Sequence, residues 1–176
     1  MSIIVALFMG LTVSAEEIIS DRRILQRESF LNLSRGSYLD SKLLILFSLS
    51  AIQTLSYVLI GNYILEIRSM DLSFWLILFS TSCFANVLGL NISAAFNSAV
   101  TIYILIPILL IPQILLSGVV VKFEELNPSI SSKDKVPLIG EIMTSRWAFE
   151  AAMVTQFKDN KFEKSFFDLD KEKSNA

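Results

Sequence analysis

The sequence predicts an all-α, polytopic membrane protein, and long runs without charged residues are the reason for that prediction. From Leu72 to Val121 there are fifty residues without Asp, Glu, Lys or Arg, although 18% of the chain is charged. Fifty residues suffice for two membrane helices, because one span needs about 20 residues at a rise of about 1.5 Å each. A second such run extends from Leu43 to Leu65, and a third opens the chain at Ser2 to Ala15. A mean hydropathy of +0.58 agrees with this class.

The first apolar run is interpreted as a membrane helix over about residues 2–20. A signal peptide is the alternative, because Val13-Ser14-Ala15 is similar to a cleavage site, but no Lys or Arg precedes the apolar run. The connection at residues 21–42 holds five basic residues, whereas Glu66 to Asp71 holds only one. The positive-inside rule therefore places residues 21–42 in the cytoplasm, and a cleaved signal would tend to leave them outside.

The run Ser2 to Ala15 is short for a membrane span. Its fourteen residues extend about 21 Å, against roughly 30 Å of hydrocarbon. Two interpretations remain open: Glu16 and Glu17 lie at the membrane interface, or the chain begins inside a helix and is a fragment. The charged C-terminal residues also end without an obvious domain boundary, and we expect a fragment.

The remaining membrane helices are expected at about residues 43–65, 73–90 and 99–121. An amphipathic helical segment over residues 18–40 should stay in the cytoplasm between the first two spans. A tight external turn follows residue 65, and the polar stretch 91–98 should separate the last two spans. Pro107 and Pro112 should kink the final one.

Residues 122–176 are expected on the external side. Residues 127–134 read as an irregular loop, and a helix is expected over about residues 141–157, with Arg146 and Glu150 as an i,i+4 pair. This helix is too short and too polar to span the membrane. Residues 158–176 begin an external charged region whose fold the sequence does not define.

Few side chains offer chemistry. There is no His and a single Cys, Cys83, which excludes histidine-based catalysis or metal binding and a disulfide within the chain. No Gly-Lys dipeptide occurs, so a P-loop is absent from the sequence. We therefore expect no enzyme activity, no metal site, no cofactor bound by this chain and no nucleic-acid partner.

Four uncharged polar residues lie within the predicted spans, namely Gln53, Thr54, Asn86 and Gln113. Each is a candidate for a substrate path, but hydrogen bonding between helices is the commoner role of such residues. The sequence Ala85-x-x-x-Gly89 is a weak signal for close helix approach.

The order of these elements resembles the membrane domain of type-2 ABC exporters of the G (White/pleiotropic drug resistance) subfamily, over about residues 5–157. From Thr12 to Leu44 the chain has Ser-Ala, an acidic residue, an Arg pair, a Glu, and then Ser-Tyr and a Lys before the next span. This is similar to the family's second helix, cytoplasmic coupling helix and third helix. Leu115 to Val121 resembles the close of its fifth helix, and Thr144 to Ala152 resembles part of its large external loop.

The resemblance implies the permease part of an ATP-driven exporter, which moves a hydrophobic or amphipathic substrate by alternating access in the plasma (inner) membrane. It implies two partners besides the lipid bilayer: a second permease copy, and an ABC ATPase domain, fused or separate, that binds ATP and Mg. The family's ATPase domain and first helix would precede residue 1. A non-transporting membrane scaffold or assembly subunit is the alternative.

The resemblance also assigns residues. Coupling to the ATPase is implied for Glu17, Arg22, Arg23, Arg27 and Glu28. For the arginines, anchoring at anionic lipid is the alternative, at about 1 kcal/mol per charge. A substrate path is implied for Leu7, Gly10, Ile111, Val119 and Val120. Some family members carry a Phe at the position of Gly10 that stacks on flat aromatic drugs, so Gly10 makes a planar drug a poor substrate candidate. Val119-Val120 replaces a Leu-Leu pair that plugs the family's central path, so the plug should be smaller here. An external cap that re-enters the outer leaflet is implied for Arg146, Trp147 and Glu150.

Overall fold

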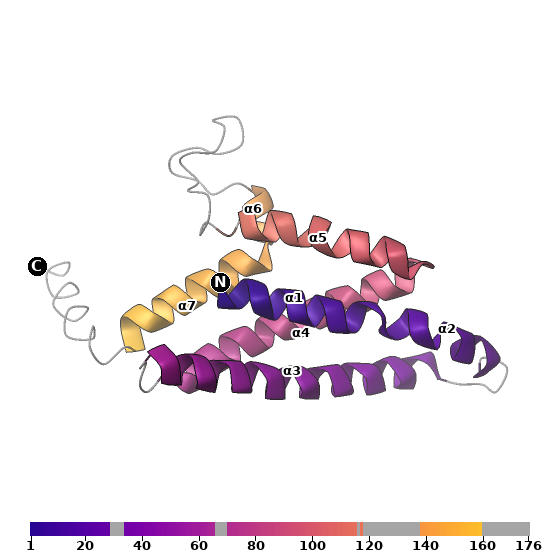
Figure 1. Ribbon diagram of the computed structural model, residues 1–176, viewed down its shortest axis with the longest axis horizontal. Coiled ribbons are helices and arrows are strands. Elements are labelled where there is room, and N and C mark those ends of the chain that lie inside the picture. The colour runs from indigo at the N-terminus through magenta and orange to yellow at the C-terminus, as the bar shows by residue number, and fades with distance from the viewer. Residues whose placement is uncertain (29–33, 66–69, 116, 118–137, 160–176) are drawn as a thin grey trace, which may run out of the picture.

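The computed structural model describes residues 1–28, 34–65, 70–115, 117 and 138–159, and these form an all-α fold as predicted. The helices in chain order are α1 (Ser2–Ala15), α2 (Glu17–Glu28), α3 (Arg35–Leu65), α4 (Asp71–Ala95), α5 (Ala99–Leu115), α6 (Leu138–Ile142) and α7 (Thr144–Asp159). Their arrangement is shown in Figure 1.

The prediction of about four membrane helices is confirmed by length and composition. Within the described residues, three stretches are long and apolar enough to cross a membrane: Ser2–Arg22, which includes the start of α2, Gly36–Leu65 and Asp71–Ala95. The shorter apolar helix is α5, with 17 residues. Its predicted end at residue 121 lies outside the described residues.

Several helix ends differ from the prediction. Helix α1 ends at Ala15 instead of about residue 20, and α2 begins at Glu17. Helix α3 begins at Arg35 instead of residue 43, and α4 continues to Ala95, through most of the polar stretch expected to break it. Charged and polar residues mark where hydrocarbon ends, but a helix can continue beyond that point because its backbone hydrogen bonds are satisfied internally.

Helix α4 is the centre of the bundle. Helices α1 and α3 both pack on it and touch each other much less, while α5 packs along α1. At one end α2 contacts α4, and at the other end α7 packs against α4, α1 and α5. The main apolar core joins α1, α4 and α5 through Leu7, Leu11, Ala15, Ala85, Ile92, Ile102, Ile106 and Leu110.

Small residues let α1 and α4 approach each other closely. A Cβ added to Gly10 would lie 2.7 Å from the Ala85 Cβ and 2.8 Å from the carbonyl oxygen of Ser82. A Cβ added to Gly89 would collide with Ser14 and lie 3.1 Å from the carbonyl oxygen of Leu11. The weak signal of Ala85-x-x-x-Gly89 is therefore confirmed as a contact at which van der Waals packing holds membrane helices together.

Hydrogen bonds between helices add to this packing. The Asn86 side-chain amide donates to the Ser50 hydroxyl at 2.7 Å, and Ser82 donates to the same oxygen at 3.1 Å. This ties α4 to α3, and the expected interhelical role of Asn86 is confirmed. Thr54 instead donates to the Ser50 carbonyl within its own helix.

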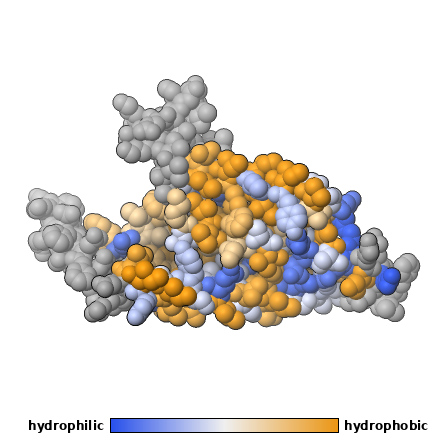
Figure 2. All heavy atoms as spheres, in the orientation of Figure 1, coloured by the Kyte–Doolittle hydropathy of each residue, from blue (hydrophilic) through white to orange (hydrophobic). Residues whose placement is uncertain are grey.

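The outer surface of the bundle is apolar. On α3, for example, Leu44, Ile60 and Tyr63 are 70%, 62% and 86% exposed. Figure 2 shows hydrophobic side chains over most of one face, with polar ones gathered toward the end where α2 lies. Such a surface suits lipid hydrocarbon, because large exposed apolar areas are unfavourable in water.

We expect Gly10→Ala to lower the thermal stability of the complete transporter in detergent. The added methyl group meets backbone and a Cβ atom, which cannot rotate away, and overpacking of this kind costs about 1–3 kcal/mol. The matched control is Gly61→Ala in α3, where an added Cβ meets nothing within 4 Å. Equal melting temperatures for the two variants would contradict the close α1–α4 contact.

Candidate functional site

The candidate site is the junction at which α2 leaves α1 and rests on α3 and α4. Helix α1 ends at Ala15 and α2 begins at Glu17, so the first backbone N–H groups of α2 lack partners within their own helix. The buried Ser93 hydroxyl of α4 accepts hydrogen bonds from the N–H groups of Ile18 and Ile19, both at 3.1 Å. Ser93 therefore does for α2 what an N-cap side chain does, but from another helix.

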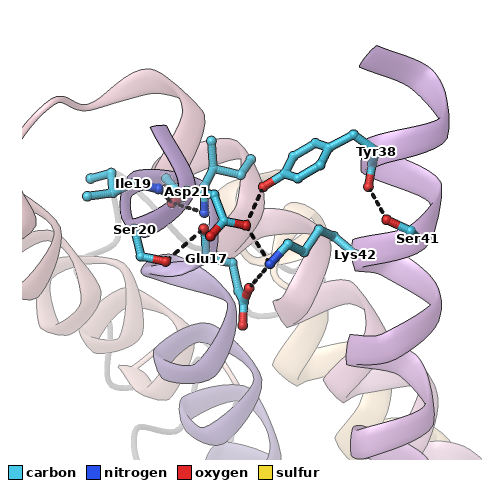
Figure 3. A network of polar contacts seen from close by, with 9 residues as sticks. Glu17, Ile19, Ser20, Asp21, Tyr38, Ser41 and Lys42 are labelled. Atoms are coloured by element: carbon cyan, nitrogen blue, oxygen red, sulfur yellow. Dashed lines mark hydrogen bonds and ion pairs between the residues drawn. The ribbon is translucent and has the colours of Figure 1, made fainter. Parts of the chain in front are cut away.

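An ionic cluster binds the same turn of α2 to α3. The Lys42 ammonium lies 2.6 Å from Glu17 Oε2 and 2.7 Å from Asp21 Oδ2. The Tyr38 hydroxyl donates to Asp21 at 3.0 Å. Glu17 and Asp21 are one helical turn apart, so both carboxylates face α3, as Figure 3 shows. We call Glu17, Asp21, Tyr38 and Lys42 the Lys42 cluster.

Asp21 and Lys42 of the cluster carry opposite charges at physiological pH. The residues of the cluster lie outside the uncharged runs Ser2 to Ala15 and Leu43 to Leu65. The hydrogen bond from Lys42 lowers the pKa of Asp21. The pKa of Lys42 is raised, first by its hydrogen bond to Asp21 and then by that to Glu17. Burial, assisted by Asp21, raises the pKa of Tyr38 to about 12. The ion pair between Asp21 and Lys42 therefore holds α2 on α3 at physiological pH.

A third attachment uses Arg22. Its guanidinium donates to the Asn97 side chain and, at 3.3 Å, to the Ala94 carbonyl oxygen. Ala94 lies in the last turn of α4, where unpaired carbonyl groups carry partial negative charge and favour a cation. Helix α2 is thus held on two sides, by α3 and by the end of α4.

The predicted coupling residues divide into two groups in the structure. Glu17 and Arg22 make the contacts that attach α2 to the bundle, whereas Arg27 is exposed near the end of α2. Arg23 and Glu28 belong to α2, but their side chains lie outside the described part of the chain. Coupling to an ATPase stays a prediction for all five.

Sequence reasoning missed four members of this junction. No role is predicted from the sequence for Asp21, Tyr38, Lys42 and Ser93. A signal for part of the cluster is present, because Glu17 and Asp21 have i,i+4 spacing and Lys42 is the last charged residue before a membrane span. No sequence signal pointed to Ser93, because its role depends on which face of α4 meets the start of α2.

The predicted substrate-path residues are not gathered at one surface of the described chain. Leu7 is buried in the core, Gly10 is buried against α4, and Ile111 on α5 is 54% exposed. Val119 and Val120 lie outside the described residues. A place on a substrate path stays a prediction for these residues.

The predicted external helix is broken at Met143 into α6 and α7. Ser145, at the start of α7, donates from its N–H to Gln113 Oε1 at 3.1 Å and from its hydroxyl to the Gln113 carbonyl at 2.5 Å. These bonds anchor α7 to α5 and confirm the expected interhelical role of Gln113.

The three predicted cap residues lie on α7. Arg146 and Glu150 form the expected pair at 4.0 Å, and the Arg146 guanidinium lies 5.2 Å from the centre of the Trp147 ring. The Trp147 indole donates to the Glu141 carbonyl at 2.6 Å. The depth of α7 in a bilayer, and thus a cap function, stays a prediction.

We expect Lys42→Met to destabilise the complete transporter by about 2 kcal/mol, because it leaves two adjacent carboxylates without their cation. Thermal unfolding in detergent measures this effect. Asp40→Asn, an exposed change in the same helix, is the control and should be neutral. Adding Asp21→Asn to Lys42→Met should restore part of the loss, and additive losses in the double variant would contradict the cluster.

Comparison with known proteins agrees with the sequence resemblance. Residues 1–157 match the membrane family described as ABC-2 type transporter. A relative from Petunia hybrida, ABC transporter G family member STR, is 30% identical over 148 residues. The match covers 81% of this chain and 17% of the relative, so the chain spans under a fifth of that protein. No solved structure matches the chain. The match over residues 1–157 shows that this chain belongs to the ABC-2 type transporter membrane family.

Proposed function

We propose that this chain is the permease part of an ATP-driven exporter, and that α2 receives the motion of an ABC ATPase domain. The family supports a role in membrane transport. The observation that carries the finer proposal is the attachment of α2. Ser93, the Lys42 cluster and Arg22 fix its first two turns to α3 and α4, while Arg27 remains exposed further along.

This attachment gives α2 the properties of a mechanical link. A force applied to a short helix reaches the membrane helices only if the helix cannot slide independently of them. Direct hydrogen bonds and ion pairs to two neighbouring helices provide that constraint, since interfaces packed in this way have discrete arrangements instead of deforming continuously. Displacement of α2 would therefore move α3 and α4 with it.

The ATPase domain, fused or separate, would bind ATP and Mg and carry out hydrolysis, and this chain would not be catalytic. Two permease copies would enclose the substrate path and open it alternately to each side. The substrate class we propose is hydrophobic or amphipathic, since no charged residue lies between Leu72 and Val121 to compensate a charged substrate.

We propose that the protein lies in the plasma membrane with residues 21–42 in the cytoplasm. The five basic residues in this connection support the orientation. Single cysteines at Ser34 and Ser69, each in a Cys83→Ser background of the complete transporter, test this orientation with a membrane-impermeant thiol reagent. We expect labelling of Ser69→Cys in intact cells, and of Ser34→Cys only after permeabilisation. Labelling of Ser34→Cys in intact cells would contradict the proposed orientation.

We expect Arg27→Glu to reduce transport by the complete exporter several-fold more than it reduces ATP hydrolysis, because the exposed side chain would contact the ATPase domain. Transport and hydrolysis are measured on the same proteoliposomes. Lys158→Glu, an exposed charge reversal near the end of α7, is the matched control and should leave the ratio unchanged. If Arg27→Glu keeps the wild-type ratio, the basic residues of α2 are only membrane anchors.

A further inference from the structure

A groove of about 250 Å³ lies between α1 and α3, with α4 as its floor. It exists because α1 and α3 both pack on α4 and touch each other little. Apolar walls come from Val5, Ala6 and Met9 of α1, and polar groups come from Gln53 and Thr54 of α3 and from Ser82 of α4. Val5 and Tyr57 at its rim are 42% and 43% exposed, so the groove opens sideways.

The polar groups in the groove retain unused hydrogen-bond donors and acceptors. Thr54 donates its hydroxyl proton to the Ser50 carbonyl at 2.7 Å, and Ser82 donates to the Ser50 hydroxyl at 3.1 Å. Both oxygens can still accept a hydrogen bond. Gln53 makes no hydrogen bond within the described part of the chain, so its amide offers two donors and an acceptor. A hydroxyl group, which both donates and accepts, complements this set.

The depth of the groove indicates an uncharged ligand. Gln53 and Thr54 lie near the middle of the uncharged run Leu43 to Leu65, where the surroundings are hydrocarbon. A charged group is costly at that depth unless it is paired, and no charged side chain is among the described residues that line the groove. An amide without a partner is also unfavourable there, which favours occupation by a molecule that hydrogen-bonds to it.

The size of the groove indicates a slender ligand. The groove offers about 250 Å³, which is below the roughly 300–1,000 Å³ of sites that enclose a drug-sized ligand. An extended hydrocarbon chain with a small polar end fits this volume, with the rest of the chain among the surrounding lipid.

We propose that this groove binds an uncharged single-chain lipid that carries a hydroxyl group. The hydroxyl bonds to Gln53, Thr54 and Ser82, and the hydrocarbon chain lies along Val5 and Met9 of α1. This inference goes beyond the proposed transport function and does not depend on it, because it concerns the groove between α1 and α3 and not the residues expected on the substrate path.

The test uses the complete transporter in lipid nanodiscs and a hexadecanol probe with a diazirine on the carbon next to the hydroxyl-bearing one. After illumination, mass spectrometry locates the adducts. We expect adducts on groove residues, and we expect a tenfold excess of unlabelled hexadecanol to remove most of them. Hexadecyl sulfate, which has the same chain and a permanent charge, should not compete. Uniform labelling of lipid-facing residues, absence of groove adducts, or equal competition by the sulfate would each overturn the proposal.

Two variants with matched controls separate the site from nonspecific contact with lipid. Gln53→Leu removes the amide at similar volume and should lower groove labelling about fivefold to tenfold, the effect of one lost hydrogen bond. Ser56→Leu, an exposed position on α3 outside the groove, should have no effect. Val5→Trp should block the rim, whereas Val13→Trp on the exposed surface of α1 should not. If each variant labels like its control, no specific site exists.

Discussion

Helices α1 and α4 lie so close together that neither Gly10 nor Gly89 has room for a Cβ, and the rest of the bundle is arranged around this contact. One face of α4 carries the small residues Ser82, Ala85, Gly89 and Ser93, which are spaced three or four positions apart. The first three face α1, and the Ser93 hydroxyl accepts hydrogen bonds from the N–H groups of the first turn of α2. The same stripe therefore fixes where α1 runs and where α2 starts.

The consequence for function is that α2 is bound to the bundle before its exposed end begins. Lys42 from α3 and Ala94 from α4 hold the first two turns of α2 from two sides. Because Asn86 and Ser82 join α4 to α3 through Ser50, these three helices form one connected unit. A push on α2 would then displace α3 and α4 together, which is the behaviour that a receiver of ATPase motion requires.

The sequence predicted the membrane class and the approximate spans, because charges are excluded from hydrocarbon whatever the tertiary structure. It did not predict helix ends such as Arg35 and Ala95, where helices continue past the uncharged run. The interhelical roles of Asn86 and Gln113 followed from their depth, but their partners Ser50 and Ser145 did not. Partner choice depends on how each helix is rotated about its axis. Apolar residues lie around the whole circumference of α3 and α4, so the sequence does not define how these helices are rotated.

The central claim is that α2 moves as one body with α4. Spin labels are placed at Ile24 on α2 and Leu76 on α4, which are both exposed positions. Pulsed electron resonance on the complete transporter, with labelled copies diluted among unlabelled ones, measures the distance between them. The account predicts one narrow distance that is unchanged between nucleotide-free and ATP-bound states. A broad distribution, or a shift when ATP binds, would show that α2 moves independently and would contradict the account.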